Sequence, residues 1–108
     1  MLSAAITMLA IALIRRDGGT QFRQALDPTI VKEYAGLLEG DGSPFPPIVV
    51  FHDGATHWLA DGFYRTAAHE AAGRAEISCE VHAGTARDAR LYAATEANRT
   101  HGVRFSST

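Results

Sequence analysis

The segment from Trp58 to Ala68 joins an apolar run, an Asp-Gly pair and an alanine-rich run. This order predicts a strand that turns directly into a helix. A helix start leaves about four backbone N–H groups without intrahelical acceptors and carries roughly half a positive charge. Gly62 lets a ligand approach the backbone, and the Arg65 guanidinium in the first turn can bind phosphate oxygens in pairs. The segment therefore predicts an anion site.

Asp61 is the unusual residue of this segment, because a carboxylate repels phosphate. Two arrangements remove the conflict: Asp61 caps the helix, or it holds a metal ion that bridges to the phosphate. The plainer alternative is an ordinary strand-to-helix connection, with Asp61 as N-cap and Arg65 as a solvated surface residue. The residues alone leave these readings open.

Length and charge limit the classes of protein to consider. The 108 residues favour a single domain spanning 1–108, large enough to bury one core without disulfides or metals. A net charge of −2 provides no broad basic field of the kind that dominates DNA affinity, although it leaves room for a local arginine cluster.

Cys79 is the only cysteine, which excludes an intrachain disulfide and a thiolate metal cluster. Its surroundings, Ala75 to Val81, alternate apolar and polar residues as a strand does, so we interpret Cys79 as a small buried hydrophobe. A reducing compartment, by default the cytoplasm, is the expected location.

The run from Ser3 to Ile14 is apolar, but no positive charge precedes it and Arg15-Arg16 follow it, unlike a signal peptide. It is too short to cross a bilayer as a helix, so we expect no membrane association. A buried first strand is the predicted structure.

Residues typical of helix starts and turns predict a strand–helix–hairpin–helix–strand–helix order along the chain. Asp27-Pro28 is typical of a helix start, and Thr85 and Asp88 have the spacing of a capping box. The expected later elements are a helix from Asp27 to Gly40, a hairpin of 48–51 and 57–60, a helix at 63–72, a strand at 76–82 and a helix at 86–96. This pattern predicts an α/β (α+β) domain with a small mixed β-sheet flanked by about three helices.

Five segments, in this order, resemble the ParB N-terminal-like or sulfiredoxin-like fold family, also labelled the ParB-like nuclease domain. They are Gln21-Phe22-Arg23, Phe45 to Val50, Ala60 to Arg65, Gly84 to Ala89 and Ala97 to Gly102. The resemblance covers nearly the whole chain and implies a nucleotide site. No helix-turn-helix or dimerisation domain of the partition proteins is recognisable, so we expect a stand-alone module or a fragment.

Two ParB motifs are only partly retained. The Gly-Glu-Arg-Arg turn that binds the triphosphate of CTP resembles Gly62 to Arg65, which keeps the glycine and the final arginine. The Glu-Asn-x-x-Arg segment that helps to hold Mg²⁺ resembles Ala97 to His101, which keeps Asn98 alone. A phosphate site follows from the resemblance, whereas specificity for CTP does not.

The resulting hypothesis is a domain that binds a nucleoside triphosphate, CTP or ATP, with Mg²⁺ at the Asp61-Gly62 helix start, as a switch or a slow NTPase. Asp61 is the candidate catalytic residue, and Asp61 and Asn98 are the candidate metal ligands. The candidate nucleotide-binding residues are Gln21, Arg23, Gly62, Phe63, Tyr64, Arg65, Thr66 and His101.

Two other activities of the fold would use the same residues. Sulfiredoxin chemistry is excluded, because Phe63 stands where that family has its nucleophilic cysteine. Free serine kinases carry Asp-Gly-His-His-Arg, of which Asp61, Gly62 and Arg65 remain, and phosphotransfer would need a further carboxylate base. Asp27 and Glu33 are the candidates for that base.

A metal-dependent DNA-binding protein or nuclease is the main alternative. It would use Asp61 for the metal and a basic patch near Arg99 and Arg104 for the phosphodiester backbone. The acidic net charge weighs against it. The oligomeric state, homodimer included, stays open.

Overall fold

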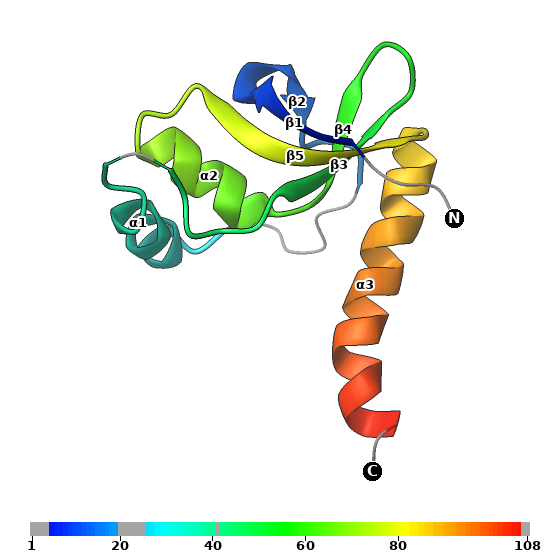
Figure 1. Ribbon diagram of the computed structural model, residues 1–108. Helices are drawn as coiled ribbons and strands as arrows, with labels where there is room; N and C mark the ends of the chain where they lie inside the picture. Colours follow the sequence, from blue (N-terminus) through cyan, green and yellow to red (C-terminus); the bar gives the residue numbers. More distant parts are fainter. Residues whose placement is uncertain (1–4, 20–25, 41, 107–108) are drawn as a thin grey trace.

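A computed structural model describes residues 5–19, 26–40 and 42–106 of the chain, with side chains described up to residue 96. The elements are β1 (Ala5–Ala10), the 3-10 helix η1 (Ile11–Leu13), β2 (Ile14–Arg15), α1 (Pro28–Gly36), β3 (Ile48–His52), β4 (His57–Asp61), α2 (Phe63–Ala71), β5 (Glu76–Ala83) and α3 (Ala86–Ser106). A mixed sheet and three α-helices in these ranges confirm the predicted fold class (Figure 1).

The five strands form one sheet in the order β1-β5-β3-β4-β2. β3 lies at the centre, antiparallel to β4 and parallel to β5. β1 is antiparallel to β5, and β2 pairs in parallel with β4. The predicted hairpin of β3 and β4 is therefore confirmed. Asp61, the last residue of β4, is paired with Val49 of β3.

The sheet curls, and the N-terminal segment shows why it must. β1 and β2 occupy opposite edges of the sheet, yet only η1 separates them along the chain. Three residues span at most about 10 Å, so the two edges must come close together. Figure 1 shows β1 and β2 next to each other above the rest of the sheet.

The expectation of one buried strand from Ser3 to Ile14 is wrong. The run breaks at Ile11, and the side chains of Ile6 and Met8 on β1 remain more than half exposed. Ile11 and Ile14 are buried in the core, at 4% and 5% exposure, and Leu9 packs against it while partly buried. Composition could not reveal this, because an apolar edge strand and an apolar buried strand read alike.

The two faces of the sheet have separate cores. On one face, Ile48 and Val50 of β3 pack with Leu59, Ile77 and Cys79, and Phe63 of α2 contacts this cluster. The neighbouring β3 residues face the other way and pack beneath α3, in a cluster of Val49, Phe51, Ala60 and Ala89 with Trp58 and Tyr92 at its margin. The alternation along β3 thus assigns α2 and α3 to opposite faces.

Both predicted caps are present. Asp27 Oδ1 accepts a hydrogen bond from Thr29 N at 2.9 Å, with Pro28 in the first turn of α1. At the start of α3, Thr85 N donates to Asp88 Oδ2 at 2.9 Å and Asp88 N donates to Thr85 Oγ1 at 3.2 Å. α3 continues to Ser106, beyond the predicted end at Glu96, and projects away from the sheet (Figure 1).

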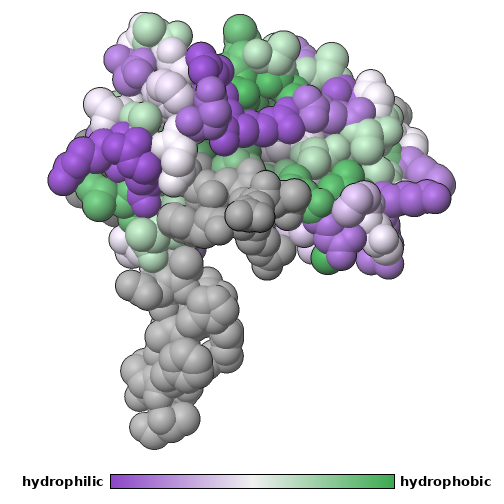
Figure 2. Space-filling model, turned by 180° about the vertical axis from the view of Figure 1, so that it is seen from behind, coloured by the Kyte–Doolittle hydropathy of each residue, from purple (hydrophilic) through white to green (hydrophobic). Residues whose placement is uncertain are grey.

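The surface seen in Figure 2 mixes residue types. Hydrophobic areas on this face are interrupted by bands of hydrophilic residues. Within the described ranges, none of the helices is long and apolar enough to cross a membrane.

Core packing around β4 gives a first prediction. Leu59 is 1% exposed, so Leu59→Ala removes buried methyl groups and is expected to lower the free energy of unfolding by about 2–5 kcal/mol. Leu91→Ala is the matched control, because Leu91 is 51% exposed and should cost no more than about 0.5 kcal/mol. Urea unfolding of the two variants measures the difference; equal losses would contradict the core assignment.

The hairpin turn depends on Asp53. Its Oδ1 accepts from the N–H groups of Ala55 and Thr56 at 2.9 and 2.8 Å, and its Oδ2 accepts from Trp58 Nε1 at 3.0 Å. The hydrogen bond from Trp58, followed by the two backbone N–H groups, lowers the pKa of Asp53 to about 2.

The pKa of Asp53 is lower in the folded state than its ordinary value of 3.8. The ionised carboxylate therefore stabilises the folded state fully at pH values above about 4. The effect is lost as the pH falls towards about 2. Asp53→Asn is therefore expected to lower the melting temperature at pH 7, with the gap to wild type narrowing between about pH 4 and pH 2. Thermal unfolding followed by circular dichroism measures this gap, and a gap independent of pH would refute the role of the carboxylate.

Candidate functional site

The candidate anion site forms where β4 turns into α2. Asp61 is the last residue of β4, and Gly62 is the N-cap of α2 with φ 108° and ψ 35°, in the left-handed region. A Cβ at Gly62 would lie 2.5 Å from Ile48 Cγ2 and 3.1 Å from Arg65 Nη2. The glycine is thus required by the backbone conformation and by its contact with β3.

The start of α2 has no side-chain cap. Gly62 has no group to accept a bond from the first turn, whereas Asp27 caps α1 and the Thr85–Asp88 pair caps α3. The possibility that Asp61 is the N-cap is therefore wrong, because Asp61 lies one residue too early. The positive end of the helix dipole at this start therefore has no side-chain cap.

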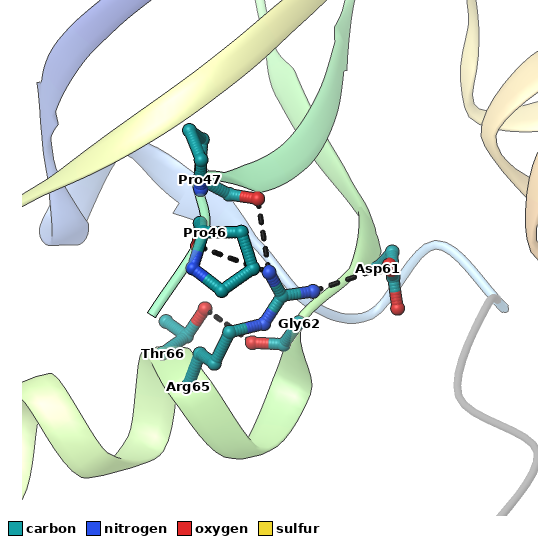
Figure 3. Close-up of polar contacts among 6 residues, drawn as sticks. All are labelled: Pro46, Pro47, Asp61, Gly62, Arg65 and Thr66. Atoms are coloured by element: carbon teal, nitrogen blue, oxygen red, sulfur yellow. Dashed lines mark hydrogen bonds and ion pairs between the residues drawn. The ribbon is translucent and has the colours of Figure 1, made fainter. Parts of the chain in front are cut away.

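Arg65 is held by backbone and side-chain acceptors (Figure 3). Its Nη1 donates to the carbonyl oxygens of Pro46 and Pro47 at 3.0 and 2.9 Å, and its Nη2 donates to Asp61 Oδ2 at 3.1 Å. The side chain is only 16% exposed. Arg65 is therefore not the solvated surface residue of the plainer reading, and it fixes the segment that leads into β3.

Asp61 is half exposed, and its ion pair with Arg65 uses Oδ2. Oδ1 has no partner within the described ranges. Mg²⁺ binds through one or two carboxylates and completes its shell with water and phosphate, so this carboxylate fits such an ion as a single protein ligand. Among the residues whose positions are described, no group of three or more His, Cys, Asp or Glu residues could hold a metal.

The other candidates on α2 have structural contacts. Thr66 is fully buried, and both its N and its Oγ1 donate to Gly62 O, at 2.9 and 2.8 Å. Phe63 packs against the core. The hydroxyl of Tyr64 accepts from Asp27 N at 2.8 Å, and its ring lies 6.0 Å from that of Tyr34, so Tyr64 joins α2 to α1.

Four candidates lie outside the residues or side chains that the structure describes. Gln21 and Arg23 lie outside the described residues. Asn98 and His101 belong to α3, but their side chains lie beyond the described part of that helix. Of the two acids considered as a kinase base, Asp27 caps α1 with its carboxylate and Glu33 is exposed on α1.

Cys79 is confirmed as a core residue, with no exposed surface. Its Sγ donates to Ile77 O at 3.3 Å, and burial raises the pKa of the thiol to about 11. A thiolate at this position is strongly disfavoured, so the only cysteine of the sequence is poorly suited to act as a nucleophile.

Sequence reasoning did not identify His69, which is only 4% exposed. Its Nδ1 lies 2.7 Å from Arg65 O, and since a carbonyl only accepts, Nδ1 carries the hydrogen. The i, i+4 spacing from Arg65 was the available signal, but a histidine on a helix has many other uses. The two proline carbonyls that hold Arg65 have no signal in the sequence, because every residue has a carbonyl group.

No protein-family model and no curated protein matches the sequence. Among solved structures, the chain is similar to sulfiredoxin from Arabidopsis thaliana, with 27% identity and a TM-score of 0.67 over 82% of this chain and 96% of that one. It is also similar to C-terminally truncated ParB from Caulobacter crescentus complexed with CTP-gamma-S, with 16% identity and a TM-score of 0.70. That match covers 85% of this chain and 52% of the ParB chain.

The same Caulobacter ParB complexed to the centromeric parS site matches with 14% identity and a TM-score of 0.62, over 81% of this chain and 44% of that one. The chain thus spans about half of each ParB structure. Together these similarities confirm the resemblance read from the five segments: the domain has a ParB/sulfiredoxin-like fold.

The close contact at Gly62 gives a third prediction. Gly62→Ala and Gly73→Ala both place a Cβ at positive φ, which costs about 1–2 kcal/mol. Only the Gly62 variant also meets Ile48, and overpacking adds about 1–3 kcal/mol; nothing lies within 4 Å of a Cβ at Gly73. Chemical unfolding should rank Gly62→Ala as the less stable variant, and the reverse order would contradict this geometry.

Proposed function

We propose that this domain binds a nucleoside triphosphate, with its phosphates at the start of α2. The uncapped N-terminus of α2, with a guanidinium nitrogen beside its N-cap, is the observation that carries the proposal. Arg65 Nη2 lies 3.1 Å from the position that a Cβ of Gly62 would occupy. The helix dipole and a fixed cation therefore both favour an anion at the start of α2.

The position of Arg65 defines its role in this proposal. Its Nη1 stays with Pro46 and Pro47, while Nη2 and Nε face the side on which Asp61 is the acceptor. A phosphate oxygen would share or replace the Asp61 carboxylate at Nη2. Binding then needs no large movement of Arg65, because the proline carbonyls already hold its guanidinium in place.

Mg²⁺ is the cofactor that this exchange favours. Once phosphate takes part of Arg65, Asp61 has carboxylate oxygens for a cation, and the ion would offset the negative charge of the triphosphate. The CTP-gamma-S complex of the similar ParB structure supports a nucleotide at this fold. The base, and the choice between a switch and slow hydrolysis, are set by residues other than this backbone site.

The fourth prediction tests the proposal by isothermal titration of the chain with CTP, ATP, GTP and UTP, with and without Mg²⁺. We expect one or more of them to bind in the presence of Mg²⁺, with Arg65→Ala weakening the affinity by at least about tenfold. Asp61→Asn should keep the fold and reduce the effect of Mg²⁺, because an amide oxygen is a weaker ligand than a carboxylate.

Arg74→Ala is the matched control for Arg65→Ala. Arg74 also binds loop carbonyls, through Nη2 to the oxygens of Leu38, Gly40 and Gly42, but it follows the end of α2 instead of lying in its first turn. A general loss of loop structure would affect both variants, whereas loss of the phosphate site affects Arg65→Ala alone. The absence of binding to any nucleotide would overturn the proposal.

DNA is the second candidate partner, because one similar ParB structure is complexed to the parS site. A nuclease would need Asp61 to hold a metal at a phosphodiester. Plasmid cleavage that requires Mg²⁺ and disappears in Asp61→Asn, with no binding of free nucleotides, would favour this alternative.

A further inference from the structure

A cavity lies at the other end of α2 from Gly62. It has a volume of about 310 Å³, at the lower end of the range for small-molecule sites. Its apolar wall comes from Met8, Phe45, Pro46 and Ile77, which belong to the β1–β5 edge and to the segment before β3. A site of this size fits a small ligand with an apolar body.

His69 contributes a polar atom to this cavity. Only 4% of the surface of His69 is exposed, and the residue lines the cavity. Its Nδ1–H is committed to Arg65 O, so Nε2 of the neutral ring is an acceptor. Within the described ranges, every fully buried side-chain nitrogen or oxygen has a hydrogen-bond partner. Nε2 has no such partner there, so it is not fully buried. Because His69 lines the cavity, we infer that Nε2 is exposed to it.

Arg74 supplies the charge. Its Nη2 is occupied by three backbone carbonyls, at 2.7, 3.0 and 2.7 Å, which fix the guanidinium at the cavity wall. Its Nε and Nη1 groups donate to no acceptor in the described part of the chain. A fixed guanidinium with remaining donors suits a carboxylate, which accepts two parallel hydrogen bonds.

Two hydroxyls and one acid complete the lining. Ser43 Oγ accepts from Phe45 N at 3.1 Å, so its hydrogen can be donated outward, and Ser78 adds a second hydroxyl. Glu76 is exposed at the margin and disfavours a ligand with more than one negative charge. A single carboxylate is therefore preferred to a phosphate.

We propose that this cavity binds a small monocarboxylate that has an apolar body and a hydroxyl or N–H donor. The carboxylate pairs with Arg74, the donor bonds to His69 Nε2, and the apolar body packs on Phe45 and Ile77. Asp61, Gly62 and Arg65 do not line this cavity. The proposal for the cavity therefore does not depend on nucleotide binding at the start of α2.

The fifth prediction uses para-hydroxyphenylacetate as the probe with ¹⁵N-labelled wild-type protein at pH 8. Backbone amides of Ile77 and Ser78 should shift, and the imidazole Nε2 signal of His69 should move as it accepts the phenol hydrogen bond. The signals of His57, on β4 and outside the cavity lining, should stay in place. Using the wild-type chain avoids any loss of folding.

Phenylacetate lacks the donor and para-hydroxyphenylethanol lacks the carboxylate. Each is expected to bind about tenfold more weakly than the probe, because each leaves one polar group of the site unpaired. No shift at His69 with the probe at millimolar concentration would overturn the proposal. Equal affinity for the three compounds would also overturn it, because that result indicates adsorption to apolar surface alone.

Discussion

The hydrogen bonds of Arg65 hold together the segments that meet at the candidate site. Nη1 binds the carbonyls just before β3, Nη2 binds the carboxylate that ends β4, and the residue itself belongs to the first turn of α2. Gly62 must then pass close to Ile48, which only a residue without a Cβ can do. The position of the helix start therefore depends on one buried guanidinium and one glycine. The same guanidinium is the cation that we assign to phosphate.

α2 organises two chemically different ends. Its N-terminus has no side-chain cap because the N-cap is glycine, and its later turns place His69 at the wall of a separate cavity. The two ends are connected, since His69 donates to the Arg65 carbonyl and Pro46 contributes both to the Arg65 contacts and to the cavity wall. One short helix thus gives the small domain two places where a polar ligand group meets a fixed protein partner.

Local signals in the sequence predicted local structure correctly. Asp27-Pro28 and the pair Thr85 and Asp88 act through bonds to nearby backbone, so their spacing is sufficient to predict them. The division of the N-terminal run was missed because both parts are apolar, and only pairing with distant strands separates them. The Arg65 contacts were missed for a related reason: proline carbonyls 18 and 19 residues away have no sequence signature. Residue types indicated an anion site, while its internal partners depended on tertiary geometry.

The curl of the sheet also determines the order in which the chain can assemble. β1 and β2 are synthesised before their partners, β5 (Glu76–Ala83) and β4 (His57–Asp61), so neither can pair until its partner has followed. Closing such long loops is slow compared with forming the hairpin or the helices. The β3–β4 hairpin and α2 are local in the sequence, whereas both edges of the sheet depend on contacts of the N-terminal segment with distant strands. Until that step, an apolar segment of the nascent chain lacks its native partners.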